Sequence, residues 1–442
     1  MRSWQAERVA AAAGARLAGP APVRAGDPGP ERVVIDSRTV GPGDLFVGLP
    51  GTRADGGAFA ASALAAGAWG VLVRPEHGGE ARRAAPGAVL TADDPLAALQ
   101  RLATSWREEL GCTVIGITGS TGKTSTKDLL RGMLEPYRRV VATAENLNTE
   151  IGLPLTILGA PEETEVLVLE MAMRGSGQIA ELAAIARPQI GVVVNVGPVH
   201  LELLGSMEAI ARAKAELLAA LPAGGTAVIP AGEVLLDPHV RDDVVTVTFG
   251  PGGDVDELPE HLTLPFGSAH MRLNALAALA AARAVRVEPA GAVRVALSRL
   301  RGQRLELARG IVVINDCYNA NPMSMRAALD DLAETAHARR VAVLGDMLEL
   351  GPAEHEFHLR LAEHARAAGV DVLVTVGPRA RATAEAFGSG ATALGDADAA
   401  AGLLPGLLRD GDTVLVKGSR GVGLEVVAEA LADAPGVGAG RD

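Results

Sequence analysis

Short apolar runs alternate along the chain with longer stretches whose apolar residues return at helical spacing. The runs predict strands at residues 33–35, 45–47, 69–73, 113–118, 166–169, 190–196, 311–314, 341–344, 372–376 and 413–416. The helical spacing predicts helices at residues 58–66, 94–109, 206–221 and 273–282. Because strands that are apolar throughout must be covered on both faces, this alternation predicts an α/β fold with doubly wound parallel sheets.

The length divides this pattern into three parts. At roughly 150 residues per domain, a chain of 442 residues indicates about three domains. We predict a smaller α/β N-terminal domain at residues 1–108, which includes a Pro- and Gly-rich loop at 19–30. A central parallel-sheet domain is predicted at 109–304, and a Rossmann-like C-terminal domain at 305–442.

Composition and charge restrict the possible partners. Aromatic residues make up 2% of the chain and hydrophobic residues 48%, so the cores must consist mainly of Ala, Val, Leu and Ile. The 53 acidic and 41 basic residues give a net charge of −12, which repels phosphate backbones, and we therefore expect no nucleic-acid partner. To bind an anionic substrate, the protein would need a locally positive or metal-containing site that overcomes its overall negative charge.

The sequence indicates a cytoplasmic protein. Its start lacks the apolar run of a signal peptide. The mean hydropathy is +0.22, but no apolar stretch reaches the roughly 20 residues of a membrane-spanning helix. We therefore expect no stable membrane insertion. Cys112 and Cys317 lie far apart without metal-ligand spacing, which predicts reduced, buried thiols.

The most informative motif lies between the strand 113–118 and the helix that follows. Glycines in such a turn let backbone N–H groups point at phosphate oxygens, and the helix N-terminus adds favourable partial charge. Lys123 is expected to contact the β- and γ-phosphates of ATP, and the Thr124 hydroxyl to hold Mg²⁺. Ile117 stands where the common pattern has glycine, so an ordinary Gly-rich turn is the alternative. The motif predicts a central ATP-binding domain of the P-loop type, with nucleotide contacts from Gly119, Ser120, Thr121, Gly122, Lys123, Thr124 and Ser125.

Three more residues could serve a metal site. Glu170 ends a predicted strand, and a carboxylate at the carboxyl end of a parallel strand faces the crevice where ligands bind. The alternative is a surface glutamate. His200 follows another strand and is either a ligand or an ordinary loop histidine. Lys214 shares the apolar face of its helix with Ile210 and Leu218, where a charged lysine must snorkel, pair or change its state.

Together these motifs resemble the Mur ligases, the amino-acid-adding enzymes of peptidoglycan synthesis. Residues 118–124 are similar to that family's phosphate loop, which accounts for Ile117. Glu170 and His200 match a family glutamate and a metal-binding histidine, and Lys214 matches a lysine carbamylated on Nε. The resemblance implies N6-carboxylysine at Lys214, an anion able to serve a metal. It also implies catalytic roles for Lys123, Glu170, His200, Lys214 and Arg304, and metal binding by Thr124, Glu170, His200 and Lys214.

The likeness extends over essentially the whole chain. Asn274 is similar to the family's nucleotide-contacting asparagine, and Arg304 to an arginine that reaches ATP at the domain junction. Asp316 and Asn319 lie in a run that resembles the junction motif of the third domain, and both are expected near the nucleotide.

Four runs resemble the family member that adds D-alanyl-D-alanine to a UDP-N-acetylmuramoyl-tripeptide: residues 145–152, 319–325, 344–351 and 417–421. They imply substrate contacts from Asn146, Asn148, Thr149, Asn321, Asp346, Lys417, Ser419 and Arg420. Asn321 is also a plain helix N-cap before Pro322, and residues 418–423 could form only a turn.

The first domain is expected to hold the UDP-sugar. Ser37, Arg38 and Asp55 resemble the family's residues for this end of the substrate, with strand-end turn chemistry as the alternative. The family often has a histidine two residues after the aspartate, where this chain has Gly57.

The resemblance implies an ATP- and Mg²⁺-dependent ligase that joins a carboxylate to an amine through an acyl phosphate, and we expect it to act as a monomer. One alternative is a family ligase that adds a different amino acid. The other is a P-loop NTPase switch that moves a partner, which would leave Lys214 and the third domain unexplained. The sequence does not specify the third residue of the tripeptide.

Overall fold

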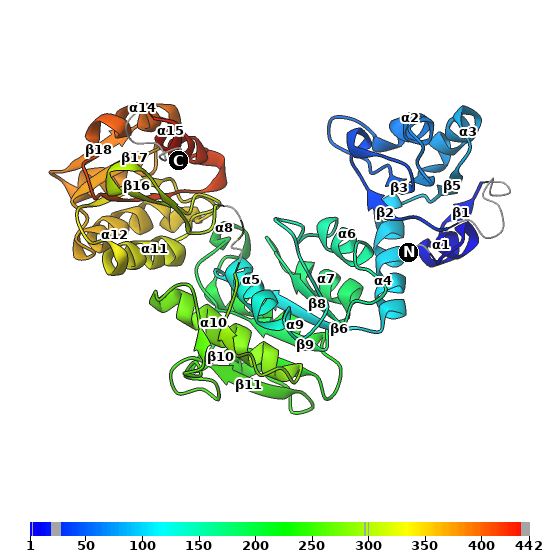
Figure 1. Cartoon of the computed structure of the whole chain (residues 1–442), viewed down its shortest axis with the longest axis horizontal. Coiled ribbons are helices and arrows are strands. Elements are labelled where there is room, and N and C mark those ends of the chain that lie inside the picture. Colours follow the sequence, from blue (N-terminus) through cyan, green and yellow to red (C-terminus); the bar gives the residue numbers. More distant parts are fainter. Residues whose placement is uncertain (2, 19–27, 296–297, 299, 435–442) are drawn as a thin grey trace.

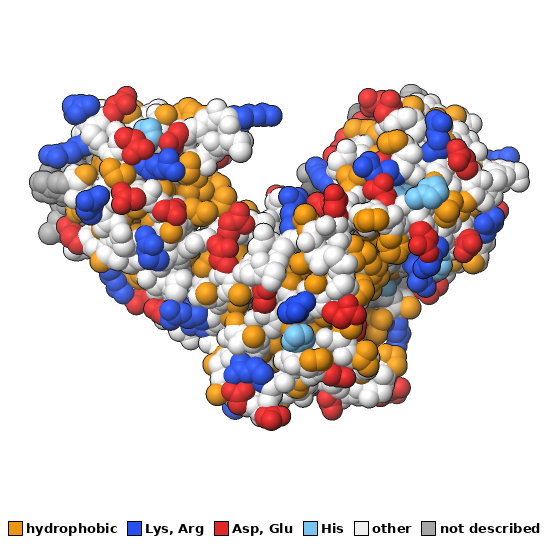
Figure 2. Space-filling model, turned by 180° about the vertical axis from the view of Figure 1, so that it is seen from behind, with side chains coloured by type: hydrophobic (Ala, Val, Ile, Leu, Met, Phe, Trp, Pro, Cys, Tyr) orange, Lys and Arg blue, Asp and Glu red, His pale blue; other side chains and the backbone are white. Residues whose placement is uncertain are grey.

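The computed structural model describes residues 1, 3–18, 28–295, 298 and 300–434, and its architecture confirms the predicted fold class. Three α/β parts follow one another along the chain, with the first and third on either side of the central one (Figure 1). Seen from behind, two lobes rise from the central part with an open hollow between them (Figure 2). The predicted loop at 19–30 lies mostly outside the described residues. None of the described helices is long and apolar enough to cross a membrane.

The first part contains a five-stranded sheet in the order β1-β5-β4-β3-β2, parallel except for β1. Its strands are β1 (Arg16–Leu17), β2 (Arg32–Val34), β3 (Asp44–Val47), β4 (Gly70–Val73) and β5 (Ala88–Thr91). The accompanying helices are α1 (Ala6–Ala13), α2 (Ala60–Ala65), α3 (Pro75–Ala84) and α4 (Pro95–Leu110).

The central part is built on a six-stranded, wholly parallel sheet in the order β11-β10-β9-β6-β8-β7. Its strands are β6 (Thr113–Thr118), β7 (Val140–Ala142), β8 (Val166–Glu170), β9 (Ile190–Val193), β10 (Thr226–Pro230) and β11 (Val245–Phe249). Its helices are α5 (Lys123–Leu134), α6 (Gly152–Leu158), α7 (Gln178–Ala186), α8 (Leu201–Leu204), α9 (Met207–Ala219) and α10 (Ala269–Ala284). A two-stranded ribbon pairs β12 (Leu262–Thr263) with β13 (Gly291–Ala292).

The third part has a six-stranded sheet in the order β14-β15-β19-β16-β17-β18, parallel except for β14. Its strands are β14 (Gln303–Glu306), β15 (Val312–Asn315), β16 (Arg340–Gly345), β17 (Val372–Val376), β18 (Ala391–Leu394) and β19 (Thr413–Lys417). Its helices are α11 (Pro322–Thr335), α12 (Glu354–Ala367), α13 (Arg381–Phe387), α14 (Ala397–Leu407) and α15 (Glu425–Asp433).

Some elements differ from the sequence predictions. The strand predicted at 190–196 ends at Val193, because Asn195 leaves the sheet to bond the loop after β6. The helix predicted at 58–66 is a 3-10 turn, Gly56–Phe59, followed by α2. The residue pair 108/109 lies inside α4 and the pair 304/305 inside β14, so each proposed domain boundary falls within a regular element.

Helix α4 joins the first part to the central part through one continuous core. Asp94 caps its N-terminus by accepting a hydrogen bond from the Ala97 N–H. On its buried face, the Trp106 ring packs edge-on against Trp4 of the first part, 5.4 Å between centroids. Trp106 Nε1 also donates to the carbonyl of Ala160 in the central part, at 3.0 Å. The third part instead has apolar clusters of its own.

Leu102→Ala should destabilise the first and central parts together. Leu102 is fully buried in the core they share, and leucine-to-alanine changes in cores cost about 2–5 kcal/mol. All three tryptophans, Trp4, Trp69 and Trp106, precede residue 109, so denaturant unfolding followed by tryptophan fluorescence reports on this unit. The midpoint should fall. As a matched control, Leu329→Ala in the core of the third part should leave the fluorescence transition in place while lowering the one seen by circular dichroism.

Candidate active site at the carboxyl edge of the central sheet

The loop between β6 and α5 presents uncapped backbone N–H groups at the carboxyl edge of the central sheet. Gly122 is the N-cap of α5, and no side chain caps this helix. Its φ of +75° is the left-handed conformation that favours glycine. A Cβ atom at this position would lie 2.4 Å from Asn274 Oδ1. The predicted nucleotide-contacting asparagine therefore packs directly against the loop.

Asn195, which belongs to none of the predicted sites, fixes the shape of this loop. Its Oδ1 accepts hydrogen bonds from the N–H groups of Ser120 at 3.0 Å and Thr121 at 2.9 Å. Its Nδ2 donates to the carbonyl and hydroxyl oxygens of Thr121. Ser120 Oγ donates to the Gly197 carbonyl at 2.9 Å. The loop is thus preformed, which lowers the entropic cost of binding a phosphate chain.

Lys123 folds back over the loop. Its Nζ donates to the Gly119 carbonyl at 2.8 Å. Desolvation lowers the pKa of Lys123, while the nearby Glu170 carboxylate opposes this shift. A phosphate bound in the loop would give the ammonium an anionic partner in place of the carbonyl.

Thr124 and Glu170 meet where a hard cation could be held. Thr124 Oγ1 donates to Glu170 Oε2 at 2.8 Å, and Asn148 Nδ2 donates to the other carboxylate oxygen at 2.8 Å. The Glu170 N–H donates to Thr143 Oγ1, which anchors the end of β8. A hydroxyl and a carboxylate that face each other are oxygen donors of the kind Mg²⁺ uses. This donor set therefore fits the predicted metal.

Lys214 is buried without a partner. Helix α9 begins after Ser206, whose hydroxyl caps it by accepting from the Ala209 N–H. The Lys214 side chain is 1% exposed, and its amine forms no hydrogen bond or ion pair with any described residue. Burial lowers the pKa of Lys214 well below its ordinary value, and the charge of Lys123 lowers it further.

His200 contacts the third part of the chain. Its Nδ1 lies 2.5 Å from Glu349 Oε2. Burial lowers the pKa of His200, and Glu349 opposes this shift. The charges of Lys123 and Lys214 also act on the imidazole. The three predicted residues therefore share one electrostatic neighbourhood.

A cavity of about 790 Å³ lies between the central and third parts. Predicted residues that line it are Ser120, Thr121, Gly122, Lys123, Thr124, Ser125, Asn274, Arg304, Asp316, Asn319, Asn321 and Lys417. Phe249, Phe266, His270 and Arg301 also line it and were missed, because none of them belongs to a motif that the sequence reveals. Glu170, His200 and Lys214 are not part of this lining.

Two predicted cations at the cavity are held by carboxylates. The Arg304 guanidinium donates to Asp331 at 2.8 Å. Lys417, 2% exposed, donates through Nζ to Asp316 Oδ2 at 2.6 Å and to the Asn319 carbonyl at 3.0 Å. A ligand at either cation would therefore compete with a carboxylate that is already bound there.

Predicted residues of the third part also have structural partners. Asp346 Oδ1 accepts from the N–H groups of Arg379 and Ala380, and Ser419 Oγ accepts from the Leu348 N–H. Asn321 caps α11 in a reciprocal capping box with Ser324. Arg420, at 57% exposure, pairs with Glu425 at 3.0 Å.

In the central part, Asn146 and Thr149 are exposed on the loop whose Asn148 reaches Glu170.

Three family descriptions match the chain in order. "Mur ligase family, catalytic domain" matches residues 31–107, "Mur ligase middle domain" 117–260, and "Mur ligase, glutamate ligase domain" 300–420. The chain belongs to the Mur ligase family.

Curated relatives and solved structures agree with this assignment. The UDP-N-acetylmuramoyl-tripeptide–D-alanyl-D-alanine ligase of Mycobacterium tuberculosis (strain CDC 1551 / Oshkosh) is 43% identical, and the match covers 90% of this chain and 91% of the relative. The Bacillus subtilis (strain 168) ligase of the same name is 37% identical over 91% and 93%. MurF from Acinetobacter baumannii matches with a TM-score of 0.86 and 28% identity over 98% and 99% of the chains. MurF ligase from Thermotoga maritima in complex with ADP matches with a TM-score of 0.79 and 31% identity over 90% and 96%.

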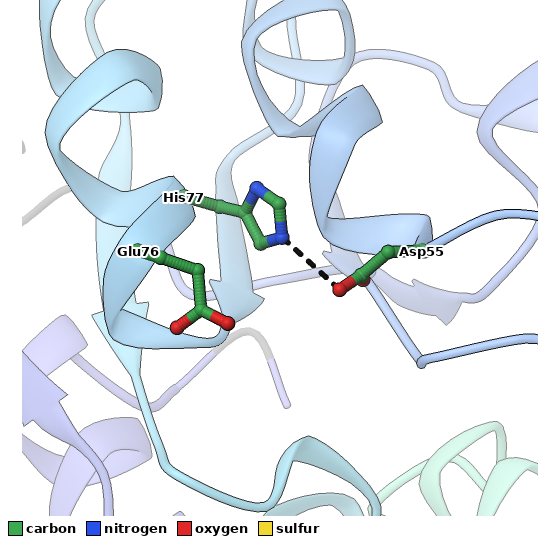
Figure 3. Close-up of side chains that lie close together, drawn as sticks. All are labelled: Asp55, Glu76 and His77. Atoms are coloured by element: carbon green, nitrogen blue, oxygen red, sulfur yellow. Dashed lines mark ion pairs between the residues drawn. The ribbon is translucent and has the colours of Figure 1, made fainter.

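The first part of this Mur ligase carries a second polar cluster, at the carboxyl edge of its own sheet. Asp55 Oδ2 lies 3.2 Å from His77 Nε2, and Glu76 lies beside them at the start of α3 (Figure 3). A Cβ atom at Gly57 would lie 2.2 Å from His77 Cδ2. The imidazole therefore occupies the space that a side chain at position 57 would need. Sequence reasoning missed His77, because only the fold brings α3 over this glycine.

The other predicted residues of this edge lie on the turn after β2. Asp36 caps the 3-10 turn Ser37–Thr39 by accepting from the Arg38 N–H, and it also pairs with the Arg38 guanidinium at 2.6 Å. These hydrogen bonds lower the pKa of Asp36 to about 2. The geometry is that of strand-end turn chemistry, with the hydroxyl of Ser37 and the exposed guanidinium of Arg38 still available to a ligand.

Gly122→Ala should weaken nucleotide binding by this Mur ligase. The new Cβ would both strain the left-handed backbone and collide with Asn274 Oδ1. We expect the affinity for ADP, measured by calorimetry, to fall by at least about tenfold, the equivalent of roughly 1.4 kcal/mol. Gly232→Ala is the matched control, because Gly232 has a φ of +71° but open space around it. If both variants bound ADP equally, the contact with Asn274 would not matter.

Proposed function

We propose that this Mur ligase uses ATP to add D-alanyl-D-alanine to UDP-N-acetylmuramoyl-tripeptide, forming an amide bond in peptidoglycan precursor synthesis. The observation that carries the proposal is the cavity where the preformed phosphate loop of the central part faces the third part. Relatives that bear this activity in their names match nearly the whole chain. The two buried free thiols support action in a reducing compartment, and we propose a cytoplasmic monomer.

The proposed reaction begins with attack of the terminal carboxylate of the tripeptide on the γ-phosphate of ATP. This step forms an acyl phosphate and releases ADP. The amine of D-alanyl-D-alanine then attacks the acyl carbon, and the tetrahedral intermediate collapses to the amide and inorganic phosphate. Because a carboxylate and a polyphosphate repel each other, the site must supply alignment and positive charge.

Residues of the loop supply part of that charge. The Lys123 ammonium would leave the Gly119 carbonyl and bind the β- and γ-phosphates, while the N-terminal N–H groups of α5 hold the phosphate chain. Asn274 would contact the nucleotide beside Gly122. Arg304 would assist from the domain junction once it exchanges Asp331 for the nucleotide, with Asp316 and Asn319 nearby.

We propose two positions for Mg²⁺. Thr124 and Glu170 would hold the first ion, and His200 and carbamylated Lys214 would serve the second. Bound Mg²⁺ neutralises charge on the phosphates and on the attacking carboxylate.

Carbamylation of Lys214 accounts for its burial without a partner. A neutral amine forms a bond from Nζ to the carbon of CO₂ and loses one proton to solvent, which leaves a carbamate anion. Because only the neutral amine reacts, the lowered pKa of Lys214 favours this step. The resulting oxygens would be suitable ligands for a divalent cation.

The two ends of the substrate are assigned to the outer parts. We propose that Ser37, Arg38 and Asp55 hold the UDP-sugar, and that Asn146, Asn148 and Thr149 border the peptide near Glu170. Asn321, Asp346, Lys417, Ser419 and Arg420 would form the D-alanyl-D-alanine site of the third part. Lys417 and Arg420 are the cations available there for the carboxylate of the dipeptide.

Phosphate release from ATP tests the function directly. We expect release to require both UDP-N-acetylmuramoyl-tripeptide and D-alanyl-D-alanine. Release with a single amino acid and a shorter acceptor would instead place the enzyme elsewhere in the Mur ligase family. Release without any small substrate would favour an NTPase switch and overturn the proposal.

Lys214→Met should abolish ligase activity and yet raise the thermal unfolding midpoint in buffer depleted of CO₂ and metal. Methionine has a similar length but no amine to desolvate. Lys127→Met is the matched control, because the equally buried Lys127 is paired with Asp128 at 2.7 Å and with the Thr143 carbonyl. It should lower the midpoint. Small carboxylates should restore part of the activity of Lys214→Ala, and full activity of that variant without them would exclude the carbamate.

A further inference from the structure

One carboxylate of the third part reaches into the metal-binding neighbourhood of the central part. Glu349 lies in the turn between β16 and α12, and its Oε2 is 2.5 Å from His200 Nδ1. Its other oxygen, Oε1, is 3.9 Å from Arg174 Nε. His200 follows β9, and Arg174 follows β8 by four residues. Glu349 therefore bridges the two central loops that follow the strands of Glu170 and His200.

This contact selects one nitrogen of His200. In the neutral imidazole one ring nitrogen carries a proton and the other has a free lone pair. The Glu349 carboxylate can only accept, so the proton is placed on Nδ1 and the lone pair on Nε2. Metal-binding histidines commonly donate their second N–H group to a carboxylate in this way, which fixes both tautomer and ring orientation.

The backbone adopts an unusual conformation at both residues of this contact. His200 has a φ of +53° and Glu349 a φ of +63°, left-handed conformations that are unusual for residues other than glycine. Next to them, a Cβ atom at Gly351 would lie only 3.2 Å from the Glu202 Cα, which shows how closely the loop of Glu349 approaches the loop of His200. The two loops thus pack closely enough to hold the carboxylate against the ring.

We propose that Glu349 is a positioning residue that couples the docking of the third part to metal binding by His200. When the third part is docked, Glu349 presents His200 Nε2 to the second metal. When it moves away, the ring loses its orienting partner and the metal binds more weakly. The inference rests on the proposed role of His200. It adds that the third part, which binds the amine, controls the metal ligand His200. The charge of the phosphates and the attacking carboxylate would then be fully neutralised only when the domains close.

Manganese binding provides a test that does not depend on activity. Mn²⁺ is titrated into the full chain with a non-hydrolysable ATP analogue and UDP-N-acetylmuramoyl-tripeptide, and free Mn²⁺ is followed by electron paramagnetic resonance. His200→Ala should lose the weaker of two sites. Glu349→Ala should weaken that site by about 10–100-fold. Glu349→Gln should weaken it less, because the amide oxygen still accepts from Nδ1.

Glu202→Gln is the matched control. It removes the same charge two residues from His200, yet Glu202 forms no hydrogen bond or ion pair with any described residue. It should leave both manganese sites unchanged. Thermal unfolding of each variant separates a loss of metal from a loss of fold.

Nitrogen-15 spectra of histidine-labelled protein give a second readout. The His200 signals, identified by their loss in His200→Ala, should show the Nδ1–H tautomer in the wild type and a shift toward Nε2–H in Glu349→Ala. If Glu349→Ala bound both manganese ions as the wild type does, the inference would fail while the role of His200 stood. If Glu349→Gln lost the weaker site completely, Glu349 would be a direct ligand instead. If His200→Ala kept both sites, the metal role of His200 in the proposed function would fail as well.

Discussion

Two lysines held at one edge of the central sheet set the conditions for the rest of the site. Lys123 and Lys214 each have a lowered pKa because both are desolvated. The charge of Lys123 lowers the pKa of Lys214 further. The buried Glu170 carboxylate opposes this shift for Lys123. Two unneutralised ammonium groups in such a place would be costly. In the proposed function, the arrangement would become favourable through a phosphate chain at Lys123 and a carbamate at Lys214. The charge of the site is therefore complementary to anionic ligands and is not balanced by the protein alone.

The parts of the chain are joined in two physically different ways. Helix α4 joins the first and central parts through buried apolar side chains, which can separate only at a large hydrophobic cost. The third part touches the central one through polar contacts such as His200 with Glu349. Partly exposed ion pairs contribute little net free energy and exchange readily for ligand contacts. Relative motion of the third part is therefore the motion that this architecture permits, and the cavity lies at that junction.

Local sequence signals predicted the fold well but did not predict the tertiary contacts between side chains. The β6–loop–α5 unit follows from a short apolar run, glycines and a helical pattern, and Glu170 follows from its place at a strand end. The burial of Lys214 follows from helical periodicity alone. What the sequence could not predict are pairs brought together by tertiary structure. Glu349 meets His200 from 149 positions away. Strand β9 ends early because the Asn195 side chain accepts hydrogen bonds from the N–H groups of the loop. The hydrophobic pattern of the sequence does not reveal this interaction.

Two predicted binding cations, Lys417 and Arg304, show why a sequence motif need not reveal its functional contact. Lys417 is bonded to Asp316, and Arg304 to Asp331, so both cations already have an acidic partner. Lys417 is buried, and the Asp316 carboxylate offsets the cost of removing its charge from water. A carboxylate or phosphate that enters the cavity offers the same chemistry as these aspartates. Binding is then an exchange of one anion for another, and its selectivity depends on geometry rather than on net charge gained.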